Sequence, residues 1–211
     1  MIKRNNTKKT EPRWERKKDA RPKEIIAAAH TVFVEKGYSA TRVELIAAKA
    51  GVTAGTLYVY FENKEDLLKT VVREAIKPIL SFGHKFVEEF KGTPEELVHI
   101  LVHTWWDLME KPGVAGIPKL MTAESTNFPE LGKFYAEEVL THAFRIVKQV
   151  LNYGIRHGKF KIENVDMMAR VIMGSLHELT VNAHSFAKFQ PAIDISEYLK
   201  NQEQLILRGI T

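Results

Sequence analysis

A recurring helical period, interrupted by capping and breaking residues, is the feature that most constrains the fold of this chain. Apolar residues recur at the three- and four-residue spacing of an amphipathic helix, and no segment shows convincing strand alternation. Caps, glycines and prolines divide this pattern into about nine segments. The sequence therefore predicts an all-α fold. The expected helices cover about residues 22–37, 41–50, 54–60, 63–78, 94–109, 115–124, 129–158 and 165–189, and a last one from 194 onward.

Local signals set several of these boundaries. Thr41, with Glu44 three residues later, forms a capping-box pattern that predicts a helix start. Gly37 and Gly51 are expected to end helices, because glycine takes the left-handed conformation without strain. Pro78 is expected to kink or break the fourth helix. Further N-caps are expected at Thr53, Asn63, Thr93, Asn164 and Asp194.

Positive charge is concentrated near the N-terminus. Met1 to Lys64 carry 14 Lys and Arg against 7 Asp and Glu, whereas the whole chain has 31 against 26. Residues 1–21 lack hydrophobic periodicity and are expected to form a flexible basic arm. This charge distribution is typical of a nucleic-acid-binding head on a neutral body, although a solvated basic tail is the alternative. The arm carries Lys3, Arg4, Lys8, Lys9, Arg13, Arg16, Lys17, Lys18 and Arg21.

The composition excludes several classes of protein. The chain has no cysteine, which excludes disulfides, thiol catalysis and thiolate metal sites. No apolar run reaches the roughly 18 residues of a membrane helix, and no apolar segment follows the basic N-terminus as in a secretory signal. We therefore expect a cytoplasmic protein without a membrane partner.

Residues 22–64 have the proportions of a helix-turn-helix domain. Ala47 and Ala50 are small enough for two helices to cross closely, and Gly51 permits a tight turn between them. The next helix starts with short side chains that suit close approach to base edges, and hydroxyls and a lysine follow that suit phosphate oxygens. The predicted DNA contacts are Thr41, Arg42, Thr53, Ala54, Gly55, Thr56, Tyr58, Tyr60 and Lys64.

Here the sequence resembles the DNA-binding signature of the TetR family. The resemblance covers about residues 22–70 and implies a homodimer that binds a pseudo-palindromic double-stranded operator. It further implies that residues 65–211 form a ligand-binding and dimerisation domain, whose last two long helices pair with those of a second subunit. The matching positions are Thr41, Ile46-Ala47, Ala50-Gly51-Val52-Thr53, Gly55-Thr56-Leu57-Tyr58, Tyr60-Phe61, Lys64-Glu65 and Leu67-Leu68.

The function implied by the resemblance is that of a ligand-responsive repressor. A small effector would bind within the body, move the fourth helix and release the operator. Glu124, followed by Phe128 to Leu131, is also similar to a stretch of regulators of multidrug pumps.

The centre of the body is rich in aromatic and methionine side chains with a few polar groups. Such residues are usually core, but they also line adaptable apolar pockets. We expect an apolar or amphipathic effector, cationic if Glu124 faces the cavity. The candidate ligand-binding residues are His103, Trp106, Met109, Met121, Glu124, Phe128, His177 and Asn182.

The residues leave three other functions to compare with DNA binding and effector binding. His99, His103 and Asp107 share one helical stripe, but one helix rarely supplies a full coordination sphere, so no metal or other cofactor is expected. An enzyme is disfavoured because the chain lacks a glycine-rich phosphate loop, a Gly-x-Ser-x-Gly elbow and a cysteine nucleophile. An architectural DNA-binding protein would not need so large a body.

Overall fold

The computed structural model describes the backbone of residues 13–211 and the side chains of residues 21–211. This part of the chain forms helices and no strands, as the all-α prediction requires. No helix within it is long and apolar enough to cross a membrane. The helices are α1 (Arg13–Lys36), α2 (Val43–Lys49), α3 (Ala54–Tyr60), α4 (Lys64–Glu89), α5 (Pro94–Met109), α6 (Ile117–Glu124), α7 (Pro129–Tyr135), α8 (Thr141–Arg156), α9 (Val165–Ser185) and α10 (Ile195–Ile210). The π-helical segment η1 (Ala136–Leu140) joins α7 to α8, and the 3₁₀ turn η2 (Ala187–Phe189) follows α9.

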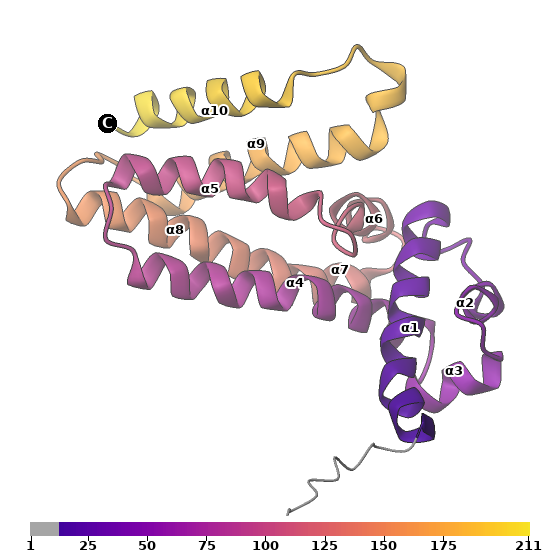
Figure 1. Ribbon diagram of the computed structural model, residues 1–211. Helices are drawn as coiled ribbons and strands as arrows, with labels where there is room; N and C mark the ends of the chain where they lie inside the picture. Colours follow the sequence, from indigo (N-terminus) through magenta and orange to yellow (C-terminus); the bar gives the residue numbers. More distant parts are fainter. Residues whose placement is uncertain (1–12) are drawn as a thin grey trace, which may run out of the picture.

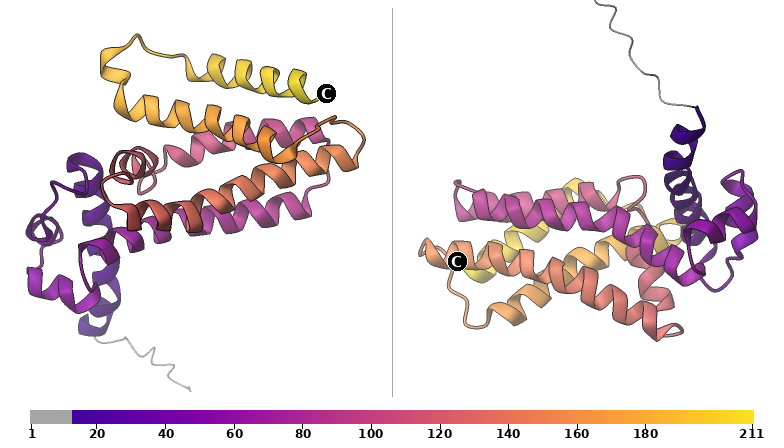
Figure 2. Two further views of the ribbon diagram at one scale, coloured as in Figure 1. Left: turned by 180° about the vertical axis from the view of Figure 1, so that it is seen from behind. Right: turned by 90° about the horizontal axis from the view of Figure 1, so that it is seen from below.

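The molecule has a small head and a larger body. Helices α1, α2 and α3 form the head, and α4 runs from it into a bundle with α5, α8, α9 and α10 (Figure 1). Helices α6 and α7 lie where the bundle meets α1, and the reverse view shows the same arrangement (Figure 2). The bundle is layered, with α10 lying along the side of the molecule opposite to α4.

Most of the predicted helix boundaries are confirmed. The Thr93 hydroxyl accepts the Glu96 amide at 3.2 Å while the Glu96 carboxylate accepts the Thr93 amide at 2.7 Å, which completes a capping box. Gly37 and Gly51 have positive φ angles of 80° and 66°. Side chains cap the other predicted starts at Thr53, Asn63, Asn164 and Asp194. The helix expected between residues 129 and 158 is present, with η1 inserted between α7 and α8.

The first helix starts earlier than predicted. It begins at Arg13 and continues through Pro22, so the second half of the expected arm has helical backbone. The predicted start at Pro22 was therefore wrong. Pro22 lies inside α1 and does not mark its first turn. The rest of the basic arm lies outside the described residues.

Two other local predictions were wrong. The Thr41 side chain does not cap α2: its hydroxyl donates to the Gly37 carbonyl at 2.6 Å, and α2 starts after Arg42 without a side-chain cap. Pro78 does not break the fourth helix, because α4 continues to Glu89. Pro78 and Glu74 both face solvent, so water can hydrogen-bond the Glu74 carbonyl that proline leaves without a donor.

Helix α4 belongs to both hydrophobic cores of the protein. Its first turns bury Leu67, Leu68 and Val72 with the head residues Phe33 and Leu57. Its last turns place Val87 in a second core that is built from α5, α8, α9 and α10. The first core also includes residues of α6 and α7 and therefore crosses from head to body. Motion of α4 relative to the head would disrupt packing in this shared core.

A buried carboxylate reinforces the junction between head and body. Glu124, at the end of α6, is 8% exposed. Its Oε1 accepts the amides of Tyr38 at 2.8 Å and Ser39 at 3.3 Å, both in the loop between α1 and α2. The prediction of Glu124 as an effector-binding residue was therefore wrong, since the carboxylate is committed to the head.

Replacing Glu124 should destabilise this junction. Glu124→Ala leaves two amides without their acceptor and should lower the free energy of unfolding by about 1–3 kcal/mol. Glu124→Gln keeps an acceptor oxygen and should lose less. Chemical denaturation of both variants tests this, with the exposed Glu130→Ala as control. Equal stability of Glu124→Ala and Glu130→Ala would contradict the role of the carboxylate.

Candidate nucleic-acid interface and apolar cavity

The turn between α2 and α3 has the geometry that the small residues suggested. The Val52 amide donates to the Ala47 carbonyl at 2.9 Å, and Gly51 takes the left-handed conformation that closes the turn. Thr53 then caps α3 by accepting the Thr56 amide at 3.1 Å. Because Leu57 is fully buried against the head core, the orientation of α3 on the head is fixed.

Helix α3 presents a face of small and hydroxyl-bearing side chains to solvent. Thr53, Gly55 and Tyr58 are exposed, and Tyr58 has half of its surface in solvent. Ala54, Thr56 and Tyr60 are half-buried. The Thr53 and Thr56 hydroxyl oxygens lie 2.9 Å apart and share one hydrogen bond. The structure thus groups these predicted contacts on one short helix that can approach a groove of DNA.

One exposed residue of α3 was missed by the sequence reasoning. Val59 is 77% exposed, although a valine on a short helix next to a core is usually buried. It lies three residues after Thr56 and therefore on the same side of the helix. That spacing could have revealed it. An exposed methyl-bearing side chain suits apolar contact with the methyl group of thymine.

Two predicted contacts serve the interior of the head instead. Thr41 is 2% exposed, so its side chain is unavailable to DNA in this conformation. Lys64 Nζ donates to the carbonyls of Tyr38 and Thr41, both at 2.9 Å, and lies 4.3 Å from the Tyr38 ring centre. The ammonium group therefore ties the first turn of α4 to the loop between α1 and α2. Arg42, by contrast, is exposed where α2 begins.

A cavity of about 390 Å³ lies in the body, mostly between α4, α5 and α8. Its wall along α5 extends from Leu97 to Met109, a distance of roughly 18 Å at the helical rise per residue. Helix α4 contributes a second wall, and at Gly83 it approaches α8 so closely that an added Cβ would lie 2.8 Å from the Ile146 side chain. The α4 lining consists of Ile76, Ile79, Leu80, Phe82, Gly83, Phe86 and Val87.

The cavity is nearly without polar groups. Its described lining contains no Asp, Glu, Lys or Arg, and its polar side chains are Thr104, Tyr135 and His177. Burial raises the pKa of the Tyr135 phenol, and burial lowers the pKa of the His177 imidazole below its usual value. Both groups are therefore uncharged at neutral pH. Such a cavity favours an uncharged apolar group and disfavours the cationic effector considered from the sequence.

The structure places only two of the predicted effector residues, Met109 and His177, in this lining. His103 lies 3.2 Å from Glu203 on the outside of α5. Phe128 packs edge-on against Tyr38 near the head, with ring centres 4.7 Å apart. The others are also outside the lining: Trp106 flanks the second core, Met121 is buried in the first core, Glu124 bonds the head, and Asn182 bonds Glu178.

Sequence reasoning missed the contribution of α4 to the cavity. Because the fourth helix was expected to end at Pro78, the predicted effector site contained no residue of α4 beyond it. Four such residues line the cavity: Ile79, Leu80, Phe82 and Phe86. Their spacing already indicates one continuous apolar face.

Large apolar side chains are exposed on α9, on the η2 turn that follows it and on α10. Met167, Val171 and Phe189 are each more than half exposed, and Leu205 on α10 is 74% exposed. Met167 and Val171 lie one turn apart on α9, so they share one face of that helix. The exposed side chains lie on the helices for which the sequence predicted pairing between subunits.

Comparison with known proteins agrees with both parts of the molecule. The family model of the bacterial regulatory proteins of the tetR family matches residues 25–71, which hold the α2–α3 turn. The model of the AefR-like transcriptional repressor C-terminal domain matches residues 96–198 in the body. The chain belongs to the TetR family of bacterial regulatory proteins. Regulators of the TetR family bind operator DNA as dimers and respond to small-molecule ligands, and this chain has the head and the helical body for both.

Several of the similar TetR-family proteins are named as regulators of fatty acid metabolism or degradation. The fatty acid metabolism regulator protein of Bacillus subtilis is 32% identical over 165 residues, which are 76% of this chain and 83% of that protein. The fatty acid degradation regulator FadR of Bacillus halodurans has a TM-score of 0.74 at 27% identity, over 96% of this chain and 98% of its own. FadR of Bacillus subtilis in complex with stearoyl-CoA has a TM-score of 0.68 at 26% identity, over 90% and 99%. The likeness to multidrug-pump regulators has weaker support.

The two hydrogen bonds of the Lys64 ammonium group predict a stability effect. Lys64→Ala removes two hydrogen bonds from a charged donor and should lower the free energy of unfolding by about 1.5–3 kcal/mol. The exposed Lys49→Ala in the same head should change it by less than about 0.5 kcal/mol. Thermal and chemical unfolding of both variants give the comparison. If Lys64→Ala had the same free energy of unfolding as the unaltered chain, the ammonium group would be free to contact DNA instead.

Proposed function

We propose that this chain is a cytoplasmic transcriptional repressor whose operator complex is released by long-chain acyl-CoA. The observation that carries the proposal is the long apolar cavity without charged lining, a shape and chemistry that suit an extended alkyl chain. The relatives support the same choice, because the Bacillus subtilis FadR structure contains stearoyl-CoA. The phosphates of coenzyme A would stay outside, since the described lining offers no cation to neutralise them.

The proposed effector would act through α4. This helix forms one wall of the cavity and, in its first turns, part of the head core. An alkyl chain that separates α4 from α5 must shift α4, and the shared core carries that shift to α1 and the α2–α3 turn. The two heads of a dimer would then no longer match their half-sites. A hundredfold loss of operator affinity requires about 2.7 kcal/mol of coupling, which is within the usual range for allostery.

For the DNA interface we propose Arg42, Thr53, Ala54, Gly55, Thr56, Tyr58, Val59 and Tyr60. The exposed members of this set lie on α3 or at the start of α2. Thr41 and Lys64 are left out because their side chains hold the head together. The domain division that we propose is residues 22–64 for DNA binding and 65–211 for effector binding and dimerisation.

The operator should be a pseudo-palindrome with half-sites about one helical turn apart or a small multiple of it, because the heads of a dimer are related by a two-fold axis. Selection from a random DNA library tests this. Tyr58→Phe should weaken binding to all sequences about equally, since phosphates carry no base identity. Val59→Ala and Thr56→Ala should change which bases are preferred. A change of base preference in Tyr58→Phe alone would show that the recognition face is misassigned.

Effector affinity should rise with the length of the acyl chain. Each buried methylene contributes about 0.8 kcal/mol, so two more carbons should tighten binding roughly tenfold until the cavity is full. Coenzyme A alone should not bind. Titration calorimetry with octanoyl-, dodecanoyl- and stearoyl-CoA, with and without operator DNA, gives the series. By reciprocity, operator must weaken acyl-CoA binding by the same factor by which acyl-CoA weakens operator binding. Equal affinities in both titrations would contradict the proposed control.

A bulky side chain in the cavity should block acyl-CoA binding without affecting operator binding. The ring of Ile100→Trp would occupy only part of a cavity that extends roughly 18 Å along α5, so it should block a long acyl chain without separating α4 from α5, and operator binding should stay intact. Asp107→Trp adds the same ring on the exposed side of α5 and serves as the matched control. The operator complex of Ile100→Trp should resist stearoyl-CoA in a gel-shift assay. Release like that of Asp107→Trp would place the effector elsewhere.

A further inference from the structure

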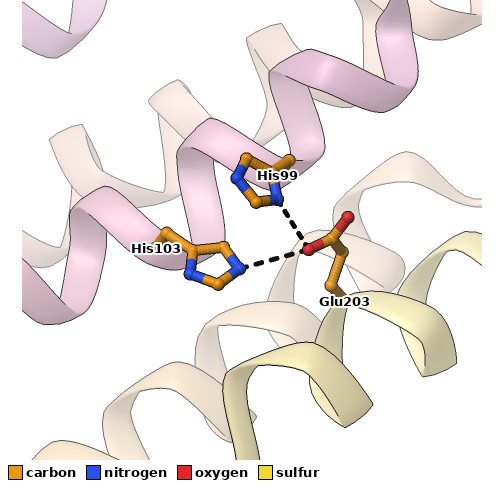
Figure 3. Close-up of side chains that lie close together, drawn as sticks. All are labelled: His99, His103 and Glu203. Atoms are coloured by element: carbon orange, nitrogen blue, oxygen red, sulfur yellow. Dashed lines mark hydrogen bonds and ion pairs between the residues drawn. The ribbon is translucent and has the colours of Figure 1, made fainter. Parts of the chain in front are cut away.

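Three side chains with metal-ligating atoms converge on the outer side of α5. His99 and His103 lie on consecutive turns of α5, and Glu203 reaches them from α10 (Figure 3). None of the three lines the apolar cavity, and none belongs to the surface of α3. Their cluster therefore has no part in the function proposed above.

The distances suit a single small cation. His99 Nδ1 lies 2.8 Å and His103 Nε2 lies 3.2 Å from the same oxygen, Oε2 of Glu203. The three ligand atoms all lie within 4.8 Å of one another. In a tetrahedral zinc site with bonds of about 2.0–2.2 Å, ligand atoms are about 3.3–3.6 Å apart. Small rotations of the side chains would bring the three atoms to that separation.

The backbone already holds these side chains in place. Histidines at positions i and i+4 share one face of a helix. The centroids of the His99 and His103 rings lie 4.2 Å apart, and the angle between the ring planes is 33°. The His103 and Glu203 side chains are 33% and 21% exposed, so the packing of α10 on α5 restricts their motion. The His99 side chain is 55% exposed, which leaves water able to complete a coordination sphere.

The donor atoms select a class of metal. Two imidazoles and one carboxylate suit Zn²⁺ and neighbouring divalent transition metals, whereas Mg²⁺ and Ca²⁺ prefer oxygen ligands. Three protein ligands with an open position for water is a common arrangement around zinc. We propose that His99, His103 and Glu203 form a Zn²⁺-type site that fastens α10 to α5.

The position of this site gives it a structural consequence. Helix α5 also forms a wall of the cavity through Ile100, Leu101 and Thr104, and α10 carries the exposed Leu205. A bound ion would fix the distance between the cavity wall and a helix of the exposed apolar surface. Because the ligands come together only in the folded chain, the ion stabilises that state by mass action.

Metal titration of the full chain tests the site directly. After dialysis against a chelator, Zn²⁺ should bind at one ion per chain in calorimetry and raise the melting temperature. Co²⁺ should give the visible absorption of a four- or five-coordinate ion. His99→Ala, His103→Ala and Glu203→Gln each remove a direct ligand, so each should weaken Zn²⁺ binding by at least the roughly 10–100-fold that loss of a group supporting a ligand costs, and should remove the thermal shift. Circular dichroism should show that each variant retains its helical fold.

A matched control variant distinguishes this site from nonspecific Zn²⁺ binding by surface histidines. His184 Nε2 lies 3.5 Å from Glu110, so it is also an imidazole beside a carboxylate, but the described cluster of three ligands does not include it. His184→Ala should keep full Zn²⁺ affinity. Binding that is absent, occurs only at millimolar Zn²⁺, survives all three site substitutions or is lost equally in His184→Ala overturns the proposal. Failure of the metal site would leave the acyl-CoA proposal standing, because none of the three ligands lines the cavity.

Discussion

Burial of α4 in two cores is the constraint on which the rest of this structure depends. The helix packs Leu67, Leu68 and Val72 against the head and places Val87 in the body core. A side chain that fills a close-packed core resists displacement, so the two cores hold the ends of one rigid element. Everything that touches the middle of α4 can therefore act on the head. The apolar cavity lies against the second half of α4, along residues from Ile76 to Val87.

The junction between head and body also has a polar component, and it connects a different helix. Glu124 ends α6 and accepts two amides of the loop between α1 and α2. Pro118, six residues earlier on α6, lines the cavity. Lys64 binds carbonyls of the same loop from the start of α4. The loop is thus held by a carboxylate from one wall element and an ammonium group from another, and a change in their spacing must alter its position.

The chemistry of the cavity narrows the choice of effector more than its volume does. Cavities of this size accept many small molecules, but a lining without charges favours a ligand whose buried part is a hydrocarbon. Burial shifts the pKa values of Tyr135 and His177 in the directions that favour their uncharged forms. A cationic drug would find no counter-charge among the described lining residues, and its desolvation would oppose binding. An acyl chain has no such cost, and its charged carrier can remain in water.

The helical class, most helix boundaries and the turn of the head can be predicted from the amino-acid sequence. These depend on local chemistry: the caps at Thr53 and Thr93 bond amides three residues away, and Gly51 satisfies a backbone angle at its own position. The TetR resemblance also rests on these short-range patterns. Only the tertiary structure decided which polar side chains face the cavity, because a polar residue on an apolar helix has several possible partners. It gave Glu124 and Lys64 to the loop between α1 and α2, and it brought Glu203 to His99 and His103 across about a hundred residues of chain. Those pairings depend on how helices distant in sequence pack, and no local spacing encodes that packing.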